Sequence, residues 1–309
     1  MRKFKIIICF MIAVSGMFFS GCINHEPSTT LYIQSQYERV WNWILREVDP
    51  PIQFRAVQAW DAKIEPPETG IWITTEPWEI QGRAEVYFRL SYDLEYRGAI
   101  VLALDPWMVF RKHLNPGLTV NRVYQDAGGD GLLLIPGKDP ESVQAWVSRL
   151  VQKSPGVFPS DEKIWQECEN NLFRGNRFLQ GAQSYNWQDV FFRLMGNQQA
   201  WVYAPLSVIR NYSNSKKAIL EATAFPETPE NNQYSLHANK ILWAVPVGSE
   251  EDKEMLDKVL VWLKNPEIQT IIADYLGWIP ADPYGIPYDP VSQSSHRNWL
   301  TASYVYVVN

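Results

Sequence analysis

Short apolar segments alternate with helical patterns along most of this chain, and this alternation restricts its fold more than any other feature. A helix is predicted over residues 37–48, where apolar side chains recur at helical spacing until Asp49-Pro50-Pro51 ends the pattern. Strands that alternate with helices favour βαβ units. We therefore expect an α/β fold with a mixed, mostly parallel sheet and helices on both faces. The strands predicted in the first third cover residues 31–33, 52–57, 70–75 and 97–104.

The rest of the chain continues the alternation with more helix. Asp139-Pro140 and Ser160 are expected to begin two helices, and Asn265-Pro266 another that runs to Leu276. Further helices are predicted over residues 186–194 and 250–264, and further strands over 199–203 and 241–245.

The first 22 residues form a secretory signal. A basic head at residues 1–5 precedes an apolar run over 6–18, and Ser20-Gly21-Cys22 closes it. The stretch resembles a bacterial lipoprotein signal, although Phe19 stands where leucine is usual. The resemblance implies cleavage before Cys22, acylation (palmitate among the acyl chains) of Cys22 as the new N-terminus, and a linker over 23–30. An uncleaved membrane anchor is the alternative, and both place the folded part outside the cytoplasm, facing periplasm or cell exterior, attached to a membrane.

Composition excludes several classes of protein. The 309 residues carry a net charge of −6 and no basic block, which gives no electrostatic footprint for nucleic acid. Of the three cysteines, Cys9 leaves with the signal and Cys22 carries lipid, so Cys168 has no disulfide partner and is expected to be buried filler. The chain has 14 Trp, 15 Tyr and 13 Phe. Most of these rings are expected in the core, but the surplus also suits stacking on pyranose rings.

Three stretches, in order, are similar to the extracellular solute-binding proteins of ABC importers, of the sugar-binding type related to maltose-binding protein. The C-terminal stretch is the most specific: Trp-Ala-Val-Pro-Val-Gly-Ser-Glu at 243–250, a helix over 253–263, Asn-Pro-Glu-Ile-Gln at 265–269, and Leu-Gly-Trp-Ile-Pro-Ala at 276–281. Residues 195–209 and 99–112 resemble two earlier segments of the family. Phe110-Arg111 replaces the family's Tyr-Asn, and Leu236-His-Ala-Asn239 replaces its Gly-Gly.

The resemblance implies a two-lobe periplasmic-binding-protein-like fold with a solute in a central cleft. Lobe 1 would comprise residues 31–112 plus 230–282, and lobe 2 residues 113–229 plus 283–309. A monomer would close on its solute and be recognised by ABC permease subunits. In an open α/β sheet, ligands bind at the carboxyl ends of the strands. The residues expected to line the cleft are Trp60, Trp78, Asp105, Trp107, Tyr203, Asn239, Trp243 and Trp278.

Each of these assignments has a structural alternative. Each tryptophan is equally a core residue, and Asp105 is equally a turn residue before Pro106. Helical Trp41, Trp43, Trp146 and Trp262 are assigned to packing or to the surface.

Motifs for catalysis and for metal or cofactor binding do not emerge from the sequence. The four histidines are scattered, and of these only His237 lies beside a predicted cleft, where a hydrogen-bonding role is expected. The loop at 126–137 lacks the ligands of a calcium site, because Gly128 and Gly137 occupy ligand positions. We expect no catalytic residue, no metal and no cofactor.

Three functions stay open. The first is a lipid-anchored protein that delivers a sugar to an importer, and the second is a degenerate solute-binding fold that acts as a surface sensor or interaction lipoprotein. The third is a glycan hydrolase, for which Asp61, Glu65 and Glu76 would be the candidate carboxylates.

Overall fold

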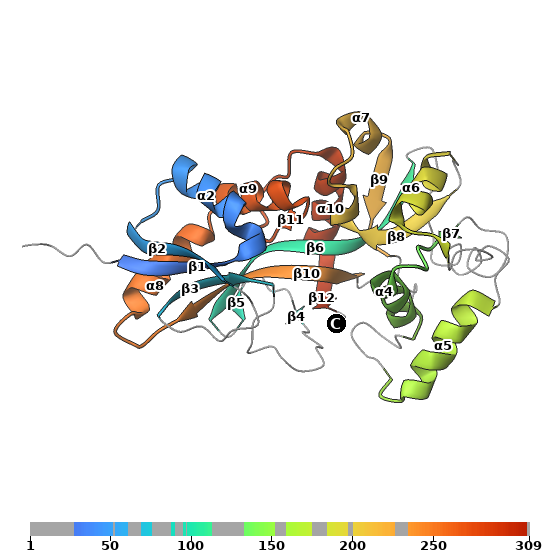
Figure 1. Cartoon of the computed structure of the whole chain (residues 1–309), viewed down its shortest axis with the longest axis horizontal. Coiled ribbons are helices and arrows are strands. Elements are labelled where there is room, and N and C mark those ends of the chain that lie inside the picture. Colours follow the sequence, from blue (N-terminus) through green and yellow to red (C-terminus); the bar gives the residue numbers. More distant parts are fainter. Residues whose placement is uncertain are drawn as a thin grey trace, which may run out of the picture.

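The computed structural model describes residues 28–51, 53–60, 69–75, 88–89, 95–96, 98–112, 133–151, 159–174, 184–196, 200–225 and 234–307. The molecule is elongated, with two groups of helices and strands joined by two long strands, β6 (Ala99–Lys112) and β10 (Tyr234–Val247) (Figure 1). Within these ranges, no helix is long and apolar enough to cross a membrane. The predicted signal, Cys22, Trp78 and the three candidate hydrolase carboxylates lie outside them.

Three parallel strands form one end of the sheet, in the order β2 (Gln53–Trp60), β1 (Ser28–Gln34) and β3 (Gly70–Thr74). Alternate residues point to opposite faces, so Leu31 and Ile33 join one apolar cluster while Tyr32 joins another. Gly70 permits the close approach of β3 to β1, since a Cβ atom there would lie 2.4 Å from the Thr30 carbonyl oxygen.

β10 and β6 continue the sheet in antiparallel register beyond β3. β6 changes its partners partway along: residues up to Pro106 pair with β10, and residues from Trp107 onward pair with β8 (Trp201–Pro205). β9 (Leu220–Thr223) also pairs with this second part of β6, and β7 (Leu133–Leu134) pairs with β8. The predicted strand over 97–104 is therefore only the first part of one strand that joins both groups. Shorter strands complete the sheet: β4 (Phe88–Arg89), β5 (Glu95–Tyr96), β11 (Ile279–Pro280) and β12 (Ala302–Val307).

Helices α2 (Glu38–Glu47), α8 (Lys253–Leu263) and α9 (Pro266–Leu276) pack on one face of the first group of strands. As predicted, α9 begins after Asn265, whose side chain accepts a hydrogen bond from the Glu267 N–H (2.8 Å). The 3-10 turn η1 (Ser35–Tyr37) connects β1 to α2.

The second group holds α4 (Pro140–Val151), α5 (Glu162–Arg174), α6 (Trp187–Gly196), η5 (Leu206–Ile209) and α7 (Asn214–Lys217). Ser160 was the expected cap of α5, but the Lys163 N–H donates to the Asp161 carboxylate (3.0 Å), so the cap is one residue later. Helix α10 (Pro290–Thr301) begins after Asp289 and was not predicted.

The mixed α/β architecture is confirmed, but the expected majority of parallel pairs is not found. Seven of the eleven strand pairs in the described part of the chain are antiparallel. The physical reason is that β6 and β10 run against each other and against most of their neighbours. The parallel pairs are β1 with β2 and β3, β10 with β12, and β7 with β8.

Candidate functional site

The neighbouring parallel strands β1 and β3 end at the same edge of the sheet, so their carboxyl ends lie side by side. From β1 the chain crosses through α2 to β2 on one side, while β3 lies on the other side. Such a topological switch point is where open α/β sheets bind ligands. Gln34 ends β1 and Thr75 directly follows β3. The Thr75 N–H and hydroxyl both donate to Gln34 Oε1, each at 3.2 Å.

This pair, Gln34 and Thr75, is here called the carboxyl-edge site. Both residues are only partly buried. Both bonds use the amide oxygen, so the amide nitrogen of Gln34 is the group that can donate to a solute. Trp60 ends the neighbouring strand β2, paired with Gln34, although its side chain lies outside the described part of the structure.

Asp105 lies where β6 passes from one set of partners to the other. Its Oδ1 accepts from the Ser207 N–H (2.9 Å), and its Oδ2 accepts from Ser207 Oγ (2.7 Å) and from Asn239 Nδ2 (2.9 Å). Burial raises the pKa of Asp105, while the bonds from Asn239 and Ser207 oppose that rise. We call Asp105, Ser207 and Asn239 the Asp105 junction. Two predicted site residues, Asp105 and Asn239, are thus brought together, but as partners of each other.

Beyond the junction, Trp107 stacks on His237 with ring centroids 5.9 Å apart and lies 5.3 Å from Tyr203. Trp187 of α6 adds a further ring contact to Trp107 at 6.2 Å. The Tyr203 hydroxyl and His237 Nδ1 are 3.1 Å apart, which confirms a hydrogen-bonding role for the histidine. Burial holds the pKa of His237 well below its ordinary value, and the charge of Arg149 lowers it further. His237 is therefore a neutral, buried side chain.

The same cluster extends inward beneath α4. Trp146 contacts Tyr203 edge-on at 5.4 Å, and Arg149 lies 4.7 Å above the ring of Phe225. Arg149 also donates to the Phe225 carbonyl oxygen at 3.4 Å. An arginine placed over an aromatic ring and bonded to a carbonyl oxygen stabilises the packing of this cluster.

The predicted aromatic site residues are largely interior. Trp243 lies within β10 and packs in a buried cluster, while Trp278 contacts Tyr37 edge-on at 6.4 Å in a different cluster beneath α9. A ring buried to this extent presents no face to a solute. The exposed fractions are 3% for Trp107, 0% for Tyr203, 3% for Trp243 and 5% for Trp278.

Sequence reasoning missed Gln34, Thr75 and Ser207. The first two could have been found, because each occupies the position directly at or after the end of a predicted parallel strand. Ser207 carried no such signal, since its bond to Asp105 spans 102 positions. Within the described ranges, no group of three His, Cys, Asp or Glu side chains could hold a metal ion.

Comparisons with known proteins show which solved structures share this fold. No family model and no curated protein sequence matches the chain. The bacterial solute receptor AcbH, described as preferring β-D-galactopyranose exclusively, has a TM-score of 0.65 at 12% identity, covering 91% of this chain and 88% of AcbH. A probable secreted solute-binding lipoprotein from Streptomyces coelicolor has a TM-score of 0.55 at 13% identity, covering 89% and 87%. The maltose-binding protein MalE of Listeria monocytogenes, solved with maltose, has a TM-score of 0.55 at 13% identity, covering 90% and 86%.

These likenesses extend over nearly the whole of each chain. The protein therefore has the fold of the extracellular solute-binding proteins, and the resemblance drawn from residues 99–112, 195–209 and 243–281 is confirmed at the level of the fold.

Proposed function

We propose that this chain is the solute-binding component of an ABC import system, anchored by lipid to the outer face of a bacterial membrane. The observation that carries the proposal is the fold, which is shared over 91% of the chain with a galactopyranose receptor. The similarity to a secreted solute-binding lipoprotein supports the anchor at Cys22. No chemical step is part of this function, because binding and closure suffice to deliver a solute.

The solute would lie between two lobes, with residues 31–112 plus 230–282 in lobe 1 and 113–229 plus 283–309 in lobe 2. The change of partners in β6 after Pro106 supports a crossing between the lobes a few residues before the proposed boundary at 112, so that residues 107–112 would belong with lobe 2. Ligand that contacts both lobes favours the closed form by its differential affinity for that form. ABC permease subunits would then recognise the closed form.

We assign the carboxyl-edge site to the solute. Gln34 offers amide hydrogens held in place by Thr75, and no described carboxylate or ammonium group bonds to either side chain. An uncharged donor of this kind matches a hydroxyl or ring oxygen of a sugar. A sugar or sugar-like solute is therefore the class that we propose.

A titration tests the proposal. Protein lacking residues 1–22 would be mixed with a panel of mono- and oligosaccharides while tryptophan fluorescence is followed. We expect a saturable change at micromolar concentration for at least one sugar. Gln34→Ala should weaken it by about tenfold, the cost of one or two hydrogen bonds. Gln188→Ala, at an exposed position of α6, is the matched control and should bind normally. A flat response from folded wild-type protein would contradict the sugar assignment.

The buried rings favour a second candidate, a solute-binding fold that acts as a surface sensor or interaction lipoprotein. Trp107, Tyr203, Trp243 and Trp278 present no stacking face, so four of the eight predicted contacts are occupied by packing. This candidate predicts no sugar response and no loss of solute uptake when the gene is deleted. Uptake that fails on deletion and returns with the wild-type gene would exclude it. Turnover of glycans in the same panel would instead support a hydrolase.

A further inference from the structure

Two long strands become irregular at the same level of the sheet. Pro106 has no N–H to donate, and it is the last residue of β6 that pairs with β10. On β10 the register shifts between Ala238 and Lys240, so Asn239 has no opposite residue. The backbone ladder that connects the two groups of strands is therefore interrupted where they join.

Side-chain bonds bridge this interruption. The Asp105 carboxylate binds Asn239 of β10 through one oxygen and Ser207 of η5 through both. η5 directly follows β8, and β8 pairs with the part of β6 beyond Pro106 and with β7. The junction thus connects β10, which pairs with the first part of β6, and η5, which follows the partner of the second part, with β6 itself.

The Asp105 carboxylate is buried, and both of its oxygens already accept hydrogen bonds within the junction. Asp105 is 1% exposed, and its two oxygens accept three bonds of 2.7–2.9 Å. A buried carboxylate that loses such partners is strongly penalised, so the arrangement permits few alternative geometries. The bonds of the junction therefore stabilise one relative orientation of β10 and η5, because both elements are bonded to the same carboxylate.

We propose that Asp105 is a positioning residue that sets the angle between the two lobes, and not a contact for the solute. The proposal rests on the proposed solute-binding function, because the angle between the lobes determines how readily they close. Releasing Asp105 from Ser207 or Asn239 frees the second group of strands to rotate about the interruption in β6. Solute affinity changes as a consequence, through the population of the closed form.

Distance measurements by electron paramagnetic resonance test this directly. Ketone-reactive spin labels would be placed on p-acetylphenylalanine at Lys258 of α8 and Gln188 of α6, both exposed and in opposite groups. The full chain in detergent would be measured without solute. Because the labels react with the ketone and not with thiols, no cysteine has to be replaced. Asp105→Asn should shift or broaden the distance distribution between the labels.

Asp139→Asn is the matched control, because Asp139 also binds the N–H (3.1 Å) and hydroxyl (2.7 Å) of a serine, Ser142, but at the start of α4. It should lower the melting temperature and leave the distance distribution as in wild type. Ser207→Ala removes one bond of the junction and should produce a smaller shift, which keeps the test decisive if Asp105→Asn does not fold.

A distribution unchanged in Asp105→Asn and Ser207→Ala, with a lowered melting temperature alone, would overturn the proposal and leave Asp105 a purely structural residue. The measurement needs no solute, so its failure is separate from a failure of the sugar titration. A shifted distribution together with a flat sugar response would keep the junction and reject the sugar assignment.

Discussion

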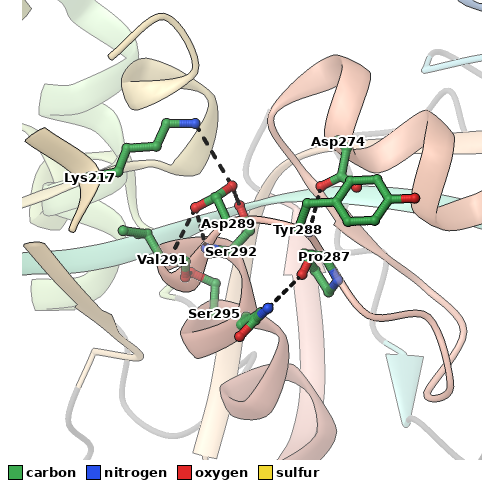
Figure 2. A network of polar contacts seen from close by, with 9 residues as sticks. Lys217, Asp274, Pro287, Tyr288, Asp289, Val291, Ser292 and Ser295 are labelled. Atoms are coloured by element: carbon green, nitrogen blue, oxygen red, sulfur yellow. Dashed lines mark hydrogen bonds and ion pairs between the residues drawn. The ribbon is translucent and has the colours of Figure 1, made fainter. Parts of the chain in front are cut away.

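At the scale of single residues, Asp274 is a carboxyl group whose surroundings oppose its charge. Burial is the main cause that raises its pKa to about 6, and Asp289 adds to the rise. Asp274 Oδ1 accepts from the Tyr288 N–H at 3.1 Å, while its buried Oδ2 has no hydrogen-bond partner among the described residues. Figure 2 shows Asp274 beside Tyr288, with Lys217 directed instead at Asp289 (3.8 Å).

The raised pKa gives a pH dependence of definite sign. An unfolded aspartate has a pKa of about 3.9, so the penalty for ionising Asp274 in the folded state begins near pH 4 and is complete above pH 6. Asp274→Asn keeps an acceptor for Tyr288 and removes this penalty. Two pKa units correspond to about 3 kcal/mol for a fully buried group, and partial exposure reduces the expected gain to about 1 kcal/mol. We expect the variant to be more stable than wild type at pH 8 and equal to it at pH 4.

Urea unfolding at both pH values measures this gain. Asp289→Asn is the comparison with the opposite sign, because Asp289 accepts from the Val291 and Ser292 N–H groups at the start of α10 and pairs with Lys217. That variant should be less stable than wild type at pH 8. A gain for Asp274→Asn that is the same at both pH values would contradict the role of the charge.

At the scale of elements, the end of α9 depends on Gly277. Its φ is +73°, and a Cβ atom there would lie 2.7 Å from Arg210 Cβ. Gly98 has a similar φ of +82°, but a Cβ atom at that position would have nothing within 4 Å, so Gly98→Ala isolates the backbone cost of about 1–2 kcal/mol. Gly277→Ala adds overpacking against Arg210 and should cost about 2–4 kcal/mol in urea unfolding. Equal losses in the two variants would show that Arg210 moves away freely.

Elements with local signals were predictable and those set by distant partners were not. α9 was predicted with its ends because Asn265-Pro266 begins it and the chain turns at Gly277. The full lengths of β6 and β10 were missed, because nothing local says that a strand will exchange one partner for another. α10 shows a signal that was overlooked, since Asp289-Pro290 has the same form as the start of α9.

The same difference between local signals and distant partners applies to the residues of the candidate site. Asp105 and Asn239 were predicted as solute contacts because they border apolar strands, and the structure bonds their side chains to each other. Their role was not readable, since it depends on Ser207, which only the folded chain brings to them. The aromatic residues were selected by type, and composition alone does not separate a buried ring from a stacking surface.

At the scale of the whole molecule, the proposed attachment to the membrane would depend on Cys22, which lies outside the described residues. A cleaved lipoprotein predicts a mature protein that begins at Cys22, lacks residues 1–21 and incorporates labelled palmitate. Cys22→Ser should lose the palmitate and keep the signal, because in the proposed lipoprotein the cysteine would be the site of both lipidation and processing. Mass spectrometry of the purified protein and radiolabelling in cells measure the two effects.

Cys168→Ser is the matched control for this experiment. Cys168 is half-buried on α5, and burial raises the pKa of its thiol, so it is a poor nucleophile. Its loss should change neither the mass of the mature protein nor the incorporation of palmitate. An uncleaved anchor would instead give wild-type protein of full-length mass without palmitate. That result would keep the protein at the membrane surface through its apolar segment at residues 6–18.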